Sequence, residues 1–237
     1  MIRAVIFDFN GLLVDDEPVH FELFRELLGS EGIDLSERDY RERYLGFDDR
    51  GCFEAALAAA GQSFDRPRID GLIARKAERY AHVAETGLKF FPGAAACLAA
   101  LGGRWPLAIC SGALRPEIEF ALARLGHRDR VGPIVSAEDT TRCKPDPEGY
   151  LLALDALRAR AWNGADLRDL KPEDCLAIED SLAGVASAKS AGMRTVAALH
   201  TYPADALREA GADAIIEGLD VLTPDWIDTY LETQPPR

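Results

Sequence analysis

Residues 4–15 read Ala4-Val5-Ile6-Phe7-Asp8-Phe9-Asn10-Gly11-Leu12-Leu13-Val14-Asp15, an apolar run followed by a carboxylate and a glycine turn. The run Ala4–Phe7 has the apolar character of a short buried β-strand, and Gly11 marks the turn after it. Asp8 therefore stands at the end of a predicted strand, where open α/β sheets bind their ligands. Asn10 follows within the same turn.

Further along the chain, short apolar runs alternate with stretches of helical periodicity. This alternation is typical of a parallel sheet built from strand-helix-strand units. The predicted strands are Ala4–Phe7, Leu107–Cys110, Ile134–Val135, Cys175–Ile178, Thr195–Ala198 and Ala214–Ile216. Polar residues follow several of them, as Asp8, Ser111 and Glu179-Asp180 do. The predicted fold class is therefore α/β, with a Rossmann-like parallel sheet as its core.

One long segment departs from this alternation. Between Pro18 and Leu88 no strand is evident, and apolar residues such as Phe21, Phe24 and Leu28 recur at helical spacing. Proline and glycine break the helical pattern near residue 89, where the alternation resumes. The sequence predicts a helical cap domain over residues 16–88, inserted into an α/β core domain made of residues 1–15 and 89–237.

Charge and cysteine content limit the classes of partner. The formal net charge of −13 argues against nucleic acid and anionic membranes, which both require clustered Lys and Arg. It does not exclude an anionic small molecule, because a local cluster of cations outweighs distant, screened charge. The five cysteines are scattered without a CxxC pair, and no signal peptide is visible. We expect a monomer in a reducing cytoplasm.

Four motifs give the chain a family resemblance. The stretches FDFNGLLVDDEP, CSG, KPDP and EDSLAGVASAKSAGM resemble, in order and spacing, the motifs of the haloacid dehalogenase-like superfamily. The predicted cap resembles that of its β-phosphoglucomutase-like phosphatases and mutases. The resemblance covers almost the whole chain. It implies that Asp8 is a carboxylate nucleophile that accepts a phosphoryl group as an aspartyl-phosphate. Taken by itself, Asp8 is more readily interpreted as a strand-end residue that caps the following turn.

The same resemblance implies a Mg²⁺ site. Its ligands would be the carboxylates of Asp8, Glu179 and Asp180, with the backbone carbonyl of Asn10. Adjacent buried carboxylates repel one another and are stable chiefly when a cation neutralises them. The alternative is that Glu179 and Asp180 form a solvated acidic helix start, favoured by the helix dipole.

Substrate contacts are expected from two parts of the chain. In the core, Ser111, Gly112 and Lys144 would bind the phosphate, Lys144 as a compact positive charge. Alternatively, Ser111 is an ordinary helix N-cap and Lys144 an exposed loop lysine. In the cap, the resemblance places His20, Arg50 and Lys76 at positions that line the substrate pocket. The competing interpretation is that Arg50 and Lys76 are solvated helix charges and that His20 packs in the cap core.

Asn10 is the main departure from the family pattern. Phosphatases and mutases of this family carry an Asp there, which protonates the leaving oxygen and deprotonates the incoming water or hydroxyl. An amide cannot exchange a proton in this way. Three outcomes remain open: slow or selective chemistry, a substitute acid supplied by Asp15, Asp16 or His20, or ligand binding without turnover.

The sequence thus predicts a Mg²⁺-dependent phosphatase or phosphomutase-like enzyme. It would act on a small phosphorylated metabolite such as a sugar phosphate, with acid–base catalysis impaired or rerouted at Asn10. The alternative is a catalytically weak protein on the same fold that binds phosphate or metal as a sensor. A dinucleotide site is disfavoured, because a single Gly11 replaces the GxGxxG pattern. Phosphonate cleavage would need a cap lysine that forms a Schiff base, and no such lysine is identified.

Overall fold

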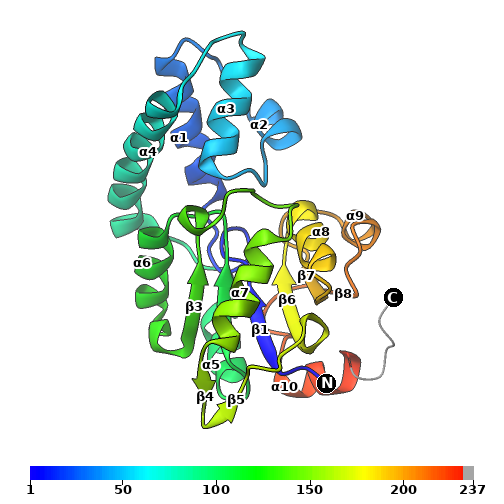
Figure 1. Cartoon of the computed structure of the whole chain (residues 1–237). Helices are drawn as coiled ribbons and strands as arrows, with labels where there is room; N and C mark the ends of the chain where they lie inside the picture. The colour runs from blue at the N-terminus through cyan, green and yellow to red at the C-terminus, as the bar shows by residue number, and fades with distance from the viewer. Residues whose placement is uncertain (232–237) are drawn as a thin grey trace. The chain divides into compact units, whose positions relative to one another are not determined.

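The computed structural model describes residues 1–231 and divides the chain into two compact units (Figure 1). One unit combines Met1–Val14 with Phe90–Arg237, and the other is Asp15–Lys89. The first contains all the strands of the main sheet, and the second is helical. We call them the core unit and the helical unit.

The core unit is built on a sheet in which every strand is parallel to its neighbours. Its strand order is β3-β2-β1-β6-β7-β8. The strands are β1 (Ala4–Phe7), β2 (Leu107–Cys110), β3 (Val131–Val135), β6 (Cys175–Glu179), β7 (Arg194–Ala198) and β8 (Ala214–Ile216). The predicted α/β fold with a Rossmann-like parallel sheet is confirmed.

Strand β1 lies in the middle of this sheet, between β2 and β6. Phe7 is level with Ile109 of β2 and with Ile178 of β6. The residues that follow these three strands therefore emerge side by side at one sheet edge. Strands β2 and β3 lie on one side of β1, and β6, β7 and β8 lie on the other. The strand order therefore reverses its direction at β1, and open α/β sheets bind ligands at such a point.

Helices connect the strands and cover the sheet. In the core unit they are α5 (Ala94–Gly102), α6 (Arg115–Leu125), α7 (Glu148–Arg158), α8 (Leu182–Ser190), α9 (Ala204–Glu209) and α10 (Pro224–Trp226), with single turns at Arg128–Arg130, Ala137–Asp139, Pro172–Asp174 and Ile227–Leu231. Helix α7 packs on β2 and β3, and its Tyr150 and Leu154 share a buried cluster with Ile6 of β1. The cluster removes apolar surface from water, which is the main favourable term in folding.

The strand predictions differ from the structure at a few ends. Ala4–Phe7, Leu107–Cys110 and Ala214–Ile216 have the predicted bounds. Strand β3 begins earlier than predicted, at Val131, because its Pro133 lies in an edge strand, where a missing backbone donor is tolerated. The antiparallel pair β4 (Ala161–Trp162) and β5 (Ala165–Asp166) was not predicted.

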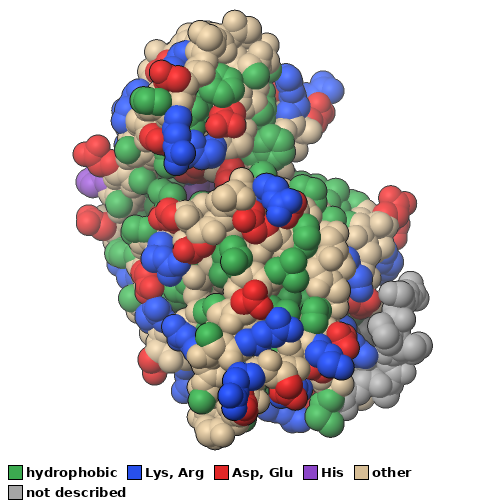
Figure 2. Space-filling view, in the orientation of Figure 1, with side chains coloured by type: hydrophobic (Ala, Val, Ile, Leu, Met, Phe, Trp, Pro, Cys, Tyr) green, Lys and Arg blue, Asp and Glu red, His purple; other side chains and the backbone are tan. Residues whose placement is uncertain are grey.

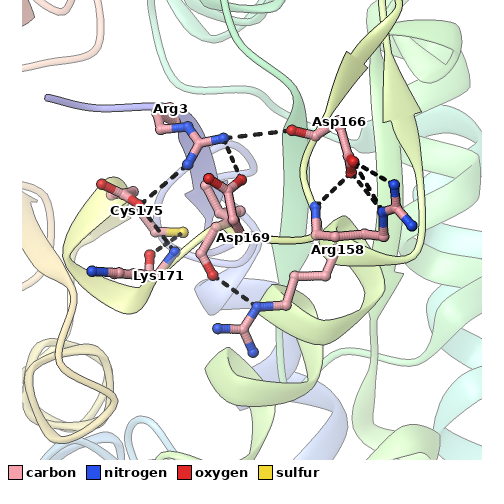
Figure 3. A network of polar contacts seen from close by, with 9 residues as sticks. Arg3, Arg158, Asp166, Asp169, Lys171 and Cys175 are labelled. Carbon is pink, nitrogen blue, oxygen red and sulfur yellow. Dashed lines mark hydrogen bonds and ion pairs between the residues drawn. The ribbon is translucent and has the colours of Figure 1, made fainter.

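A network of polar contacts ties the start of β1 to the segment before β6 (Figure 3). Arg3 donates to Asp169 Oδ1 over 2.8 Å, and its other terminal nitrogen lies 3.6 Å from Asp174 Oδ2. In the same view Arg158 of α7 donates to the Leu170 carbonyl oxygen over 2.8 Å. The network fixes the sheet at the end opposite to the edge where Asp8 emerges.

The helical unit consists of α1 (Glu17–Ser30), α2 (Glu37–Arg43), α3 (Asp49–Ala59) and α4 (Arg66–Gly87). Aspartates begin two of these helices: Asp48 accepts from Gly51 N over 2.7 Å, and Asp65 accepts from Arg68 N over 3.0 Å. Helices α1, α3 and α4 pack together around a buried cluster that includes Phe24, Phe53 and Leu72.

The surface carries charges of both signs. In Figure 2, Lys and Arg side chains are scattered among Asp and Glu over the visible face rather than gathered in one basic patch. Within residues 1–231, no helix combines the length and the apolar character that a membrane span requires.

Candidate active site

Asp8 and Lys144 meet at the carboxyl end of β1. The Asp8 backbone N donates to the Ile178 carbonyl oxygen over 2.9 Å, which continues the sheet into the loop. Lys144 Nζ donates to Asp8 Oδ1 over 2.6 Å and to Glu179 Oε1 over 2.7 Å. The Lys144 side chain is only 14% exposed, so it is not an exposed loop lysine.

Glu179 is fully buried and its two oxygens are held by different groups. Besides Lys144, Tyr150 Oη donates to its Oε1 over 2.7 Å. Its Oε2 accepts from the Asp180 backbone N and from Ser181 Oγ, each over 3.2 Å. A Cβ at Gly184 would collide with this carboxylate, so glycine is needed at that position.

Asp180 is held differently. Its Oδ2 accepts a hydrogen bond from Thr201 Oγ1. Its Oδ1 is buried and has no hydrogen-bond partner in the described part of the chain. The backbone of Gly11, with φ of 73°, passes so close that a Cβ there would collide with Oδ2. Both the close approach and the left-handed φ therefore require glycine.

These contacts allow a test of whether a cation fits. Oxygens of Asp8, Glu179 and Asp180 lie within 4.8 Å of one another, and all three residues are buried. The unpartnered Asp180 Oδ1 offers lone pairs to a hard cation, which prefers carboxylate oxygens. The residues present fit a divalent ion. The alternative of a solvated acidic helix start is wrong, because Glu179 is 0% and Asp180 is 3% exposed.

The acidic cluster shifts the protonation equilibria of its members. Burial, reinforced by the negative charge of Glu179, raises the pKa of the Asp8 carboxyl, and Lys144 opposes the shift. Burial and the charge of Asp8 raise the pKa of Asp180 well above its usual range. Burial lowers the pKa of Lys144, but the charges of Asp8 and Glu179 outweigh this effect and raise it. The lysine therefore stays charged, and the carboxylates need further positive charge to ionise together.

Ser111 and Asn10 are in contact across the neighbouring strand ends. Ser111 Oγ donates to Asn10 Oδ1 over 3.3 Å and accepts from the Ala113 backbone N over 3.0 Å. Gly112, which lies between Ser111 and Ala113 in the sequence, is exposed. The N-cap of α6 is Leu114, so the interpretation of Ser111 as the helix N-cap is wrong. The serine instead stabilises the turn before the helix.

In the helical unit, His20 and Lys76 lie in a buried polar chain. Lys76 Nζ donates to Asp49 Oδ1 over 2.6 Å and to His20 Nδ1 over 2.7 Å. His20 Nε2 lies 3.2 Å from Asp16 Oδ2, which also accepts from Tyr80 Oη over 2.6 Å. Lys76 is 0% exposed, so the alternative of a solvated helix lysine is wrong for it.

Arg50 is separate from this chain of contacts. It donates to Asp70 Oδ1 over 2.7 Å, and its side chain is 41% exposed. Among the alternatives to Asn10 as an acid, Asp15 is exposed, whereas Asp16 is fully buried. The structure thus brings together the predicted residues of the core unit, and within the helical unit it joins His20 to Lys76.

Three residues of the core site were not predicted from the sequence. Tyr150 contacts Glu179, and Thr201 contacts Asp180. His200 Nδ1 lies 3.0 Å from the Gly11 carbonyl oxygen. His200 and Thr201 follow the end of β7, so the rule that ligand sites lie at strand ends could have indicated them. Tyr150 lies on a helix and is indistinguishable in sequence from an ordinary core aromatic residue.

Comparisons with known proteins identify the family of the chain. Residues 2–192 match the family model of the haloacid dehalogenase-like hydrolases. A phosphorylated carbohydrates phosphatase of Thermotoga maritima is 31% identical over 224 residues, which are 93% of this chain and 97% of that protein. A β-phosphoglucomutase of Bacillus subtilis is 29% identical over 229 residues, which are 94% of this chain and 92% of that protein.

A solved structure extends the comparison. It is that of an Asp-to-Asn variant of CbbY from Rhodobacter sphaeroides in complex with xylulose 1,5-bisphosphate. It has a TM-score of 0.75 and 28% identity, and covers 93% of this chain and 96% of that chain. The predicted resemblance to β-phosphoglucomutase-like phosphatases and mutases is confirmed, and the chain is an enzyme of the haloacid dehalogenase-like hydrolase family.

Proposed function

We propose that this protein is a Mg²⁺-dependent phosphatase of small phosphorylated sugars that works through an aspartyl-phosphate on Asp8. The observation that carries the proposal is the position of Lys144, whose ammonium group bridges Asp8 and Glu179 while Asp180 Oδ1 stays unpartnered beside them. The relatives named above act on phosphorylated carbohydrates, which supports the substrate class.

Asp8 is the nucleophile in this proposal. One of its oxygens attacks the phosphorus atom, and the bond from phosphorus to the leaving oxygen breaks. Water then attacks the same phosphorus atom, the acyl-phosphate bond breaks, and the Asp8 carboxylate is restored. Lys144 holds the Asp8 oxygen in place and offsets the negative charge of the phosphoryl group. A bound Mg²⁺ would supply Lewis-acid stabilisation of the phosphoryl oxygens.

Asn10 determines which substrates react quickly. Its amide has no proton to donate to the leaving oxygen and no lone pair basic enough to activate water. Substrates with good leaving groups, such as acyl and aryl phosphates, need no such proton. We therefore expect them to transfer their phosphoryl group faster than alkyl sugar phosphates. The second half-reaction also lacks its base, so the phosphorylated form of Asp8 should accumulate.

Phosphoryl transfer can be tested by trapping. The protein is mixed with acetyl phosphate and Mg²⁺, and intact-protein mass spectrometry counts the phosphoryl groups attached. The expected result is one phosphoryl group on the wild type and none on Asp8→Ala. A second measurement follows phosphate release from a panel of sugar phosphates. Equal turnover by wild type and Asp8→Ala, with no trapped adduct, would overturn the proposal.

A second candidate function is binding of a phosphorylated ligand without turnover. Asn10 favours it, since the substitution removes acid–base chemistry and leaves the Asp8 and Lys144 contact intact. The CbbY structure with xylulose 1,5-bisphosphate was likewise obtained with an Asp-to-Asn variant. This candidate predicts tight binding of a sugar phosphate in calorimetry and no phosphoryl adduct on the wild type.

A further inference from the structure

The segment after β7 touches the site at two separate points. Thr201 Oγ1 donates to Asp180 Oδ2, and His200 Nδ1 lies 3.0 Å from the Gly11 carbonyl oxygen. A carbonyl oxygen can only accept, so His200 Nδ1 carries the proton of this hydrogen bond. Two adjacent residues thus reach the loop after β1 and the carboxylate after β6.

Thr201 determines the orientation of the Asp180 carboxylate. The carboxylate is 3% exposed, and one of its oxygens is occupied by the threonine hydroxyl. The Gly11 backbone closes the space next to the same oxygen. Rotation of the carboxylate is therefore restricted, and Oδ1 remains the oxygen that is open to a cation. A carboxylate fixed in this way loses less rotational freedom when it binds a cation.

His200 acts on the other side of the same site. Its ring stacks on Phe91, with centroids 3.8 Å apart and planes 3° from parallel. Phe91 is itself anchored, because its backbone N donates to the Leu13 carbonyl oxygen over 3.1 Å. The imidazole therefore has a flat support on one side and a hydrogen bond to the Gly11 carbonyl at its edge. Gly11 follows Asn10 directly, so this contact fixes the loop that carries Asn10.

We propose that His200 and Thr201 form a two-point clamp that sets the affinity of the core site for a divalent cation. Thr201 fixes the orientation of Asp180, and His200 fixes the position of the Asp8–Gly11 loop against it. Both are positioning residues, since neither needs to touch the substrate. The inference rests on the cation site of the proposed function. It adds two positioning residues, both from the end of β7, to a site whose carboxylates come from the ends of β1 and β6. Loss of such supporting contacts typically costs about 10–100-fold in metal affinity.

The test measures cation binding directly, without turnover. Mn²⁺ prefers the same oxygen ligands as Mg²⁺, and the signal of free Mn²⁺ in electron paramagnetic resonance reports binding. We expect Thr201→Val, which keeps the shape and removes the hydroxyl, to weaken Mn²⁺ binding by about 10–100-fold. Thr201→Ser keeps the hydroxyl and should bind nearly as tightly as the wild type. Thr86→Val is the matched control, because it removes a hydroxyl that donates to the Val83 carbonyl oxygen in the helical unit.

Two variants separate the contacts of His200. His200→Phe keeps a ring that can stack on Phe91 and lacks the donor to Gly11, so Mn²⁺ binding should weaken. His200→Asn places an amide donor where Nδ1 was, so binding should recover in part. Thermal unfolding of each variant without metal establishes that it is folded. A ring that only packs would give the opposite order, with His200→Phe closer to the wild type.

The outcomes distinguish a failure of the cation site from a failure of the clamp alone. If wild type and Asp180→Asn both fail to bind Mn²⁺, the cation site of the proposed function is wrong. If the wild type binds Mn²⁺, Asp180→Asn does not, and both Thr201→Val and His200→Phe match the wild type, only the clamp is overturned. Thr201→Ala serves as a second hydroxyl-free variant should Thr201→Val not fold.

Discussion

At position 10 the side chain ends in an amide whose Oδ1 accepts a hydrogen bond from Ser111 Oγ over 3.3 Å. A carboxylate of the same size could accept this bond equally well. Exchange of the amide for a carboxylate can therefore keep this contact and adds a group that can exchange a proton. Residue 10 is therefore a position at which the chemistry of the site can be changed while the contact with Ser111 is kept.

This leads to a prediction about leaving groups. In Asn10→Asp, the rate of phosphate release from an alkyl sugar phosphate should rise by about 10²–10⁴-fold, because a general acid and base becomes available. The rate with an aryl phosphate should rise less, since that leaving group needs less protonation. Steady-state rates over a series of leaving groups give the measurement. Asn10→Asp combined with Asp8→Ala is the control and should be inactive. An equal gain for every leaving group would contradict the assigned role.

A second prediction concerns Gly11. Gly11→Ala should lose stability because of its φ of 73°, and should also weaken cation binding because the new Cβ meets Asp180 Oδ2. Gly126 has the same φ of 73°, and a Cβ there would have nothing within 4 Å. Gly126→Ala should therefore lose about 1 kcal/mol of stability and keep its Mn²⁺ affinity. Urea unfolding and Mn²⁺ titration distinguish the two. Equal Mn²⁺ affinities in both variants would show that the close approach of the Gly11 backbone to Asp180 is not critical for cation binding.

The residues that could be predicted from the sequence are those whose position follows from strand ends. Asp8 and Asp180 come directly after β1 and β6, and Glu179 is the last residue of β6, so their proximity follows from the parallel sheet. The burial of Lys76 depends on how three helices pack, and a local charge pattern cannot predict it. The strand-end rule could have indicated Thr201 as a site residue, but its contact with Asp180 in particular depends on the path of a loop, which periodicity does not predict.

Among elements, the boundaries that were missed have local causes. The pair β4 and β5 consists of strands of two residues around Asn163-Gly164, with φ of 47° and 79°. Asn-Gly is a strong hairpin signal, but strands this short show no alternation that would accompany it. The first residues of β3 were not predicted, because Gly132-Pro133 is a pair that usually indicates a loop.

The network at the start of β1 gives a prediction of pH dependence. The hydrogen bond from Arg3 holds the pKa of Asp169 below its usual range. A carboxyl whose pKa is lower in the folded state adds stability above its unfolded pKa, about 3.9, and loses it as the pH falls through the folded value. Arg3→Gln should therefore be less stable than wild type at pH 7, and the difference should shrink below about pH 4.

Urea unfolding at several pH values measures this convergence. Arg168→Gln is the matched control, since Arg168 pairs with Asp166 two residues away, so the pair joins no separate segments. It should change stability less than Arg3→Gln at pH 7. A stability difference for Arg3→Gln that stays constant down to pH 2 would show that the arginine acts through packing alone.

The helical unit provides a further prediction. Lys76→Met leaves Asp49, whose side chain is 13% exposed, without its cation, and loss of one partner of a buried ion pair typically costs about 3–5 kcal/mol. Lys76→Met combined with Asp49→Leu should recover much of this loss. Arg50→Met removes an exposed pair with Asp70 and should cost less than about 1 kcal/mol.

Urea unfolding supplies these values, and kinetics on the same variants tests the predicted substrate contacts. Arg50→Met should raise KM for a sugar phosphate if Arg50 binds substrate, and its small effect on stability makes the change interpretable. No additional stability in the double variant relative to Lys76→Met would contradict the pairing of Lys76 with Asp49.

At the scale of the whole molecule, the cation site should couple to unfolding. A ligand that binds only the folded state stabilises it by about 2.7 kcal/mol at a concentration 100 times its Kd. Mg²⁺ should therefore raise the melting temperature of the wild type, and a chelator should reverse the rise. The shift should be absent in Asp180→Asn, measured by calorimetry. A shift of the same size in both proteins would place the cation elsewhere.

The chain passes from the core unit to the helical unit after Val14 and returns to the core unit at Phe90. The proximity of these two points determines how the chain can be re-engineered. Val14 and Phe90 are paired as an antiparallel bridge, although the whole helical unit separates them in sequence. Antiparallel partners can be joined by a turn of two residues. The core could thus be closed directly from Val14 to Phe90, or given a different insertion, without altering a strand of the main sheet. In this respect the chain is modular: recombination at these two points can exchange the helical unit and preserve the core unit.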